Sequence, residues 1–224
     1  MNTLRRHKYA ILLAALLGVT FVESFSQRLL RPLLSDVVLM TIMVLVFLIV
    51  FERRADRLLA FIALITAAGT SAAHFVLAGS YPQLPFRVIN HSAKLLLIGF
   101  ATFVILRNIF AQRVVRADDV LGAVCGYLLA AGAFADLFLL IEGFSPGSFS
   151  VSPGFRAGLD TWDGRIAILT NVSLASLTSI GSSAAVAVQP PATILVPLEA
   201  LFGQFYIAVV VAQVVGARLS QEPP

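Results

Sequence analysis

Long apolar runs constrain this chain more than any other feature of its sequence. Six runs of about 17 residues or more are long enough to cross a hydrocarbon core of about 30 Å as helices. They span residues 9–25, 33–51, 58–79, 88–110, 120–143 and 194–216. Hydrophobic residues make up 58% of the 224-residue chain and charged residues only 12%, which excludes an ordinary soluble domain. The sequence therefore predicts an all-α integral membrane protein with six transmembrane helices.

A seventh apolar run, residues 166–180, is too short to cross. At about 1.5 Å per residue, it reaches roughly two thirds of the way across as a helix. Asp160 and Asp163 give this helix a start signal, and its other end runs into the small polar stretch 178–185, TSIGSSAA. Irregular backbone at mid-depth is tolerated only where protein buries it or where it lines water. We expect a re-entrant helix and a loop here, the alternative being a patch of small residues for helix packing.

The basic residues cluster at the ends of the runs. With the N-terminus inside, ten of the sixteen Lys and Arg are cytoplasmic, which predicts both termini in the cytoplasm of a multi-pass protein of the inner (plasma) membrane. The net charge of +4 comes from these flanks, so we expect no nucleic-acid partner. No signal-peptide cleavage site follows the first run, which is expected to stay as a span. Few residues follow Gly216, so no cytoplasmic ligand-binding domain is expected.

Residues that carry enzyme or metal chemistry are sparse. Cys125 is the one cysteine and lies inside the fifth run, so an intrachain disulfide is impossible. His7, His74 and His91 are scattered, with no Asp or Glu at metal-ligand spacing. Because the sequence also lacks a nucleophile motif, a phosphate loop and paired carboxylates, we expect neither an enzyme nor a cofactor nor a metal beyond permeating cations.

Two patterns occupy the last quarter of the chain. Residues 178–184 read TSIGSSA, and after Pro190 residues 198–206 read LEALFGQFY. Together they resemble the pore module of tetrameric potassium channels, and above all six-span bacterial ion-channel proteins. The filter of that family is typically T-x-G-Y-G-D, and its last helix often carries L-E-A-x-x-G-Q-x-Y. The resemblance implies a homotetramer in a lipid bilayer, each chain supplying a quarter of one pore.

The filter half of the resemblance is degenerate. Against the family pattern, the candidate ion-conduction filter is Thr178, Ser179 in place of Thr, Ile180 in place of Val, Gly181 on the first Gly, Ser182 in place of Tyr, and Ser183 in place of the second Gly. In such channels backbone carbonyls replace the hydration shell of the ion. A left-handed backbone costs a non-glycine residue about 1 to 2 kcal/mol, so we expect strain at Ser183. The outer filter is expected to be widened and weakly selective, or collapsed and closed.

Three residues are expected to support the filter. Asp136 is the one acid well inside a span, and such an acid needs a partner; Arg165, Thr170 and Asn171 of the re-entrant helix are the candidates. Two roles are open for Asp136. It either braces the structure around the re-entrant helix, or it attracts ions or senses protons. Glu199 suits the positive end of the last helix and is assigned to bracing behind the filter. Ala184 stands where the family has an Asp.

The last helix carries the candidate hinge and gate. Gly203 suggests a bend or close packing, while Gln204 and Gln213 are polar residues suited to a water-filled cavity. Ala208 and Ala212 belong to a row of small residues, spaced by four, that is typical of helix crossings. Ordinary packing is the alternative to a gate.

The fourth run lacks the regular Arg spacing of a voltage sensor. Its basic residues are Arg87, Lys94, Arg107 and Arg113, and they lie near its two ends. With almost no charge inside the field, we expect opening that is insensitive to voltage. A sparse sensor formed by Lys94 and Arg107 is the alternative.

The chain is thus expected to have three parts. Residues 1–117 form a four-helix transmembrane domain, residues 118–217 a pore domain (outer helix, outer loop, pore helix, filter and inner helix), and residues 218–224 a short cytoplasmic tail. The expected function is passive, weakly selective or non-selective conduction of potassium and sodium ions. The alternatives are a non-conducting channel homologue with a collapsed filter and a small membrane transporter or assembly protein.

Overall fold

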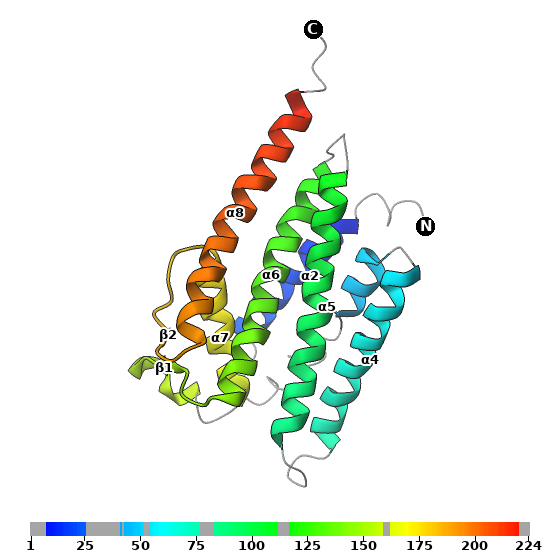
Figure 1. Cartoon of the computed structure of the whole chain (residues 1–224). Coiled ribbons are helices and arrows are strands. Elements are labelled where there is room, and N and C mark those ends of the chain that lie inside the picture. The colour runs from blue at the N-terminus through cyan, green and yellow to red at the C-terminus, as the bar shows by residue number, and fades with distance from the viewer. Residues whose placement is uncertain are drawn as a thin grey trace.

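Helices make up most of the structure (Figure 1). The computed structural model describes residues 8–25, 41, 43–51, 54–76, 83–111, 117–158 and 162–219. Its elements are α2 (Lys8–Phe25), α4 (Arg54–Val76), α5 (Gln83–Ala111), α6 (Ala117–Phe144), β1 (Phe149–Val151), the 3-10 helix η1 (Pro153–Gly158), α7 (Trp162–Leu177), β2 (Ala185–Ala187) and α8 (Ala192–Leu219). Residues 43–50 are helical apart from these elements.

Three helices in the described part of the chain are long and apolar enough to cross a membrane. They are α5 over Leu84–Phe110, α6 over Asp118–Phe144 and α8 over Ala192–Gln213. Shorter apolar stretches lie in α2 (Lys8–Gly18) and α7 (Gly164–Leu177). The prediction of an all-α membrane protein is therefore confirmed in this coarse form. The predicted run 33–51 lies partly outside the described residues.

The helices α2, α4, α5 and α6 form one bundle. In Figure 1, α5 packs between α4 and α6, and α2 lies against α6. Their shared core includes Leu12, Ala67, Leu97, Ile105 and Cys125, all nearly inaccessible to solvent. Arg107 in the last turns of α5 donates to Asp56 in the first turn of α4, with 2.9 Å between Nη2 and Oδ2. The pair joins the two helices at one end of the bundle.

A small antiparallel sheet closes the other end of the molecule. Strand β1 follows α6 and pairs with β2, with Phe149 opposite Ala187 and Val151 opposite Ala185. Five of the eighteen residues 144–161 are Gly or Pro, and this density predicted an irregular outer loop. That prediction was wrong for the strand and for η1, because Glu142 at the end of α6 organises the turn: its two carboxylate oxygens accept from the amides of Gly147 and Phe149.

A second apolar cluster joins α7 to the sheet, to the second half of α6 and to the start of α8. It includes Phe138 of α6, Phe149 of β1, Leu169 of α7 and Ala192 of α8. α7 packs against both α6 and α8, so α7 and α8 lie beside the bundle and are joined to it through α6 (Figure 1). α7, α8 and the loop between them contain the candidate pore segment.

Candidate pore segment

Helix α7 starts at the sheet end of the molecule and stops about halfway along its neighbours. Its first residue, Trp162, bonds to His91 in the early turns of α5. Its last residue, Leu177, contacts Tyr127 of α6 and lies against Gly203 of α8. Gly203 lies about 16 Å along α8 from Ala192, in a helix of 28 residues. The short run thus forms a helix that ends about halfway along α8, and α7 begins and ends three or four residues earlier than predicted.

The carbonyl of Leu177 is held from two sides. The hydroxyl of Tyr127 donates to it at 2.8 Å. A Cβ added at Gly203 would overlap with the same carbonyl oxygen, so only glycine allows α8 to approach the end of α7 this closely. α8 runs as a continuous helix through Gly203. Close packing, rather than a helix break, is what this glycine provides here.

Ser179 ends α7. The amide of Ser179 donates to the carbonyl of Ser176 at 2.8 Å, and the amide of Ile180 reaches back to Ala175 at 2.9 Å. These two bonds define a Schellman cap, whose closing residue must adopt the left-handed conformation. Ser179 does so, with φ of 58°.

The predicted strain at Ser183 is wrong. Among the described residues other than glycine, positive φ occurs at Ser179 alone. The helix cap, which the alignment to a filter pattern does not consider, places the left-handed residue four positions earlier. Gly181 takes the second positive φ of the segment, 79°.

After Gly181, the loop turns back toward the sheet end (Figure 1). The hydroxyl of Ser182 donates to Asn171 Oδ1 of α7 at 3.0 Å and accepts from the amide of Ala184 at 3.1 Å. Ser152, just after β1, donates its hydroxyl to the carbonyl of Ser183 at 2.6 Å. Residues 178–184, which we call the pore loop, are therefore fastened to the pore helix and to the sheet without the Tyr and Asp of the family pattern.

The inner part of the pore loop is exposed on the single chain. Thr178, Ser179, Ile180 and Gly181 are all exposed, and Ile180 reaches 82%, the largest fraction among the exposed large hydrophobic side chains. By contrast, Ala184 is buried in the second apolar cluster. Ala184, which was assigned to filter support, is thus a core residue at the end of the loop.

Glu199 lies behind the pore helix, completely buried. Ser173 Oγ of α7 is within hydrogen-bonding distance of both Glu199 Oε1 and the carbonyl of Ala131 in α6, at 2.7 Å from the latter. Ser176 adds a bond to the carbonyl of Val196 at 2.8 Å. These contacts tie α6, α7 and α8 together.

Three of the five residues predicted to form a hinge or gate are exposed on α8. Gln204 Nε2 donates to Ser179 Oγ at 2.9 Å, which brings α8 into contact with the pore loop. Ala208 and Ala212 follow Gln204 at intervals of four residues and are exposed on the same side of the helix. Gly203 is buried against α7, and Gln213 is half-buried.

Asp136 is buried, but its partner is not on the re-entrant helix as expected. Its Oδ1 lies 2.7 Å from Nδ1 of His91 on α5. The predicted candidates are engaged elsewhere: Arg165 pairs with Glu142, at 3.4 Å between Nη1 and Oε1, and Asn171 binds the pore loop. Sequence spacing along α7 could not reveal a partner from a helix 45 residues earlier.

Several residues that hold the segment were not predicted from the sequence. Tyr127, Ser173 and Ser152 make hydrogen bonds that position α7 or the loop after it. Asn171 was predicted to bind Asp136 and instead binds Ser182 of the loop. Polar residues inside apolar runs were the available signal, since a buried hydroxyl or amide needs a partner. Their partners are backbone carbonyls or short side chains distant in sequence, and no local pattern identifies them.

Comparison of the chain with protein-family models, with curated proteins and with solved structures gives no match.

Proposed function

We propose that this chain is one quarter of a homotetrameric cation pore in the inner membrane, with potassium and sodium as the permeating ions. The pore loop, residues 178–184, forms the narrow part of the pathway, and α8 lines the cavity beyond it. Residues 1–117 surround the pore as the remaining spans, which brings the total to six, with both termini in the cytoplasm.

One observation carries this proposal. Residues 178–184 are irregular backbone about halfway along α8, beside Gly203 and Gln204, and residues 178–181 are exposed on the single chain. In a membrane, irregular backbone at that depth must be buried by protein or line water. Hydroxyl and amide groups at Thr178, Ser179 and Gln204 are unsuited to lipid. A ring of copies around a water-filled axis meets both requirements.

The uncovered state of α8 agrees with this assembly. Only 17% of its candidate span is buried within the chain, against 61% for α6. Its exposed large hydrophobic residues are Ile194, Leu198, Leu201, Phe205, Ile207, Val209 and Val211. In a tetramer, part of this surface packs on the neighbouring copies, and the side with Gln204 faces the axis.

The loop favours weak selectivity. Selective filters stack several rings of carbonyls that replace the hydration shell. Here the amides of residues 178–181 donate to carbonyls of α7, so this backbone is coiled as a helix end and is not extended to stack rings of carbonyls. The rest of the loop is held by the side chains of Ser182 and Ser152. An ion would retain part of its water at such a constriction, so potassium and sodium should pass at similar rates.

Cation flux into liposomes tests the proposal. Wild-type protein is reconstituted under opposing potassium and sodium gradients, beside a variant with Ser182→Tyr and Ser183→Gly, which restores two residues of the family pattern. Ala184→Asp is left out because Ala184 is buried among apolar side chains. We expect wild type to pass both ions at rates within about threefold of each other, a difference below 1 kcal/mol in barrier height, and the variant to favour potassium.

The other results separate the alternatives. A silent wild type beside a conducting variant identifies a non-conducting homologue with a collapsed filter. Silence from both, with a potassium ionophore confirming intact vesicles, contradicts the pore and leaves a transporter or assembly protein. A strong preference of wild type for potassium would contradict the weak selectivity.

A further inference from the structure

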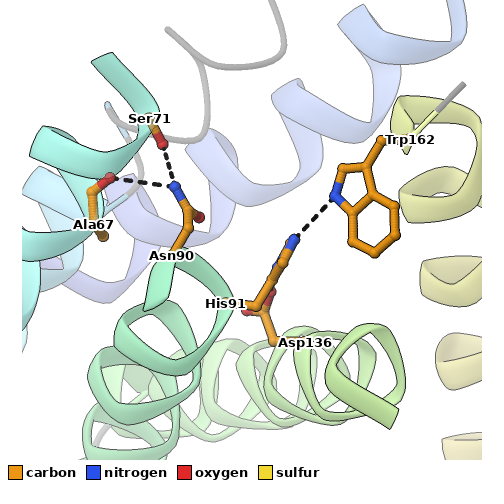
Figure 2. A network of polar contacts seen from close by, with 6 residues as sticks. All are labelled: Ala67, Ser71, Asn90, His91, Asp136 and Trp162. Carbon is orange, nitrogen blue, oxygen red and sulfur yellow. Dashed lines mark hydrogen bonds and ion pairs between the residues drawn. The ribbon is translucent and has the colours of Figure 1, made fainter. Parts of the chain in front are cut away.

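A buried chain of three polar side chains links α5, α6 and α7 (Figure 2). Asp136 Oδ1 of α6 lies 2.7 Å from Nδ1 of His91 in α5, and the indole Nε1 of Trp162 donates to Nε2 of His91 at 3.2 Å. His91 is 4% exposed and Asp136 7%. Trp162 is the first residue of the pore helix α7, so this chain of contacts fixes where that helix begins.

The partners determine which nitrogen of His91 carries the proton. The indole N–H of Trp162 is a donor and has no acceptor atom. Nε2 of His91 must therefore offer a lone pair, and the ring proton must be on Nδ1, where it is donated to Asp136. The imidazole in this arrangement is neutral, with one hydrogen bond on each nitrogen.

We propose that His91 is a proton-binding site that controls the attachment of the pore helix. A proton arriving at Nε2 would turn that atom into a donor facing the donor of Trp162, and the hydrogen bond between them could not persist. The resulting imidazolium still donates from Nδ1 to Asp136. Proton binding at His91 thus breaks the hydrogen bond that holds the start of α7 to α5. It leaves a charged pair between α5 and α6.

The surrounding charges set the balance of this site. Asp136 of α6 attracts the proton. On α5, Arg87 places its guanidinium 4.4 Å from the centre of the Trp162 ring, and Lys94 is buried one turn beyond His91; both oppose a second positive charge. Between α6 and α7, the acid Glu142 is paired with Arg165.

The neighbouring helix α4 meets this region through neutral groups. Asn90, next to His91 on α5, donates from Nδ2 to Ser71 Oγ at 2.7 Å and to the carbonyl of Ala67 at 3.4 Å (Figure 2). These bonds hold α5 in place independently of His91. Loss of the Trp162 bond should therefore move the start of α7 rather than α5.

The fluorescence of Trp162 tests proton binding without any need for ion flux. Trp162 is the sole tryptophan of the chain, so its emission reports on this indole alone. The full-length protein in lipid nanodiscs is titrated from pH 8 to pH 5, the range in which histidine side chains ordinarily change charge. We expect a reversible loss of intensity and a shift of the emission maximum, because an imidazolium quenches indole and the indole N–H changes partner.

Three variants make the result specific. His91→Gln should abolish the transition, and His74→Gln, which removes a histidine from α4, should leave it unchanged. Asp136→Asn keeps an acceptor for Nδ1 but carries no charge, and it should change the midpoint pH of the transition, an effect that a merely structural role for Asp136 would not produce. If His91→Gln does not fold, the comparison of wild type with Asp136→Asn decides alone. Constant emission in wild type, or the same transition in His91→Gln, would overturn the proposal.

The consequence for conduction rests on the proposed function, and its test is separate. In liposomes, acidification from pH 8 to pH 5 should change the cation flux of wild type at least twofold more than that of His91→Gln. A fluorescence transition in a protein that conducts no ions contradicts the pore and leaves the proton site intact. Ion flux without a fluorescence transition contradicts the proton site and leaves the pore intact.

Discussion

At the scale of single residues, the backbone of the pore loop differs most from expectation. Alignment to the family pattern placed the costly left-handed residue at Ser183, where the family has glycine. The structure places it at Ser179, with φ of 58°, because this residue closes the cap of α7. Local hydrogen bonding of a helix end decided the conformation, and a filter pattern contains no information about it.

Ser179→Gly should therefore be more stable than Ser179→Ala. Both variants lose the hydroxyl that accepts from Gln204, but only glycine adopts positive φ without a steric penalty. We expect a difference in the free energy of unfolding of about 1 kcal/mol in favour of glycine. The measurement is denaturant unfolding in one detergent. At position 183, the same pair of substitutions serves as control, and glycine should have no advantage there; equal values for the two variants at position 179 would contradict the cap.

At the scale of helices, the apolar pattern located α7, α8 and the loop between them to within a few residues. It could do so because the length and hydrophobicity of a run are local properties. The sheet between β1 and β2 was missed, since pairs of three-residue strands carry almost no pattern. The partner of Asp136 was also missed, because helix neighbours depend on tertiary packing.

The contact between α7 and α8 depends on Gly203. An alanine there would put its Cβ into the carbonyl of Leu177, and α8 would have to move away from the end of the pore helix. Gly203→Ala should lower the free energy of unfolding by about 1 to 3 kcal/mol, as overpacking does. Thermal unfolding in detergent measures this. Gly69→Ala on α4 is the matched control, because nothing lies within 4 Å of its added Cβ and alanine favours the helix. Equal stabilities of the two variants would exclude the close contact.

At the scale of the whole molecule, the described part of the chain leaves polar and apolar surface uncovered. The loop after α7 is exposed about halfway along α8, and the rest of the described chain leaves most of α8 uncovered. The sequence predicted a tetramer through the LEALFGQFY motif and its spacing from the loop. The structure adds a physical reason for partners, which is that polar groups at Ser179 and Gln204 need protein or water around them.

The mass of the assembled particle tests the central claim most directly, that one chain supplies a quarter of a cation pore. Protein extracted in a mild detergent is measured by native mass spectrometry after removal of the micelle. The expected particle contains four chains of 24.0 kDa each. Particles that contain a single chain, at protein concentrations at which the fold is intact, would contradict the pore.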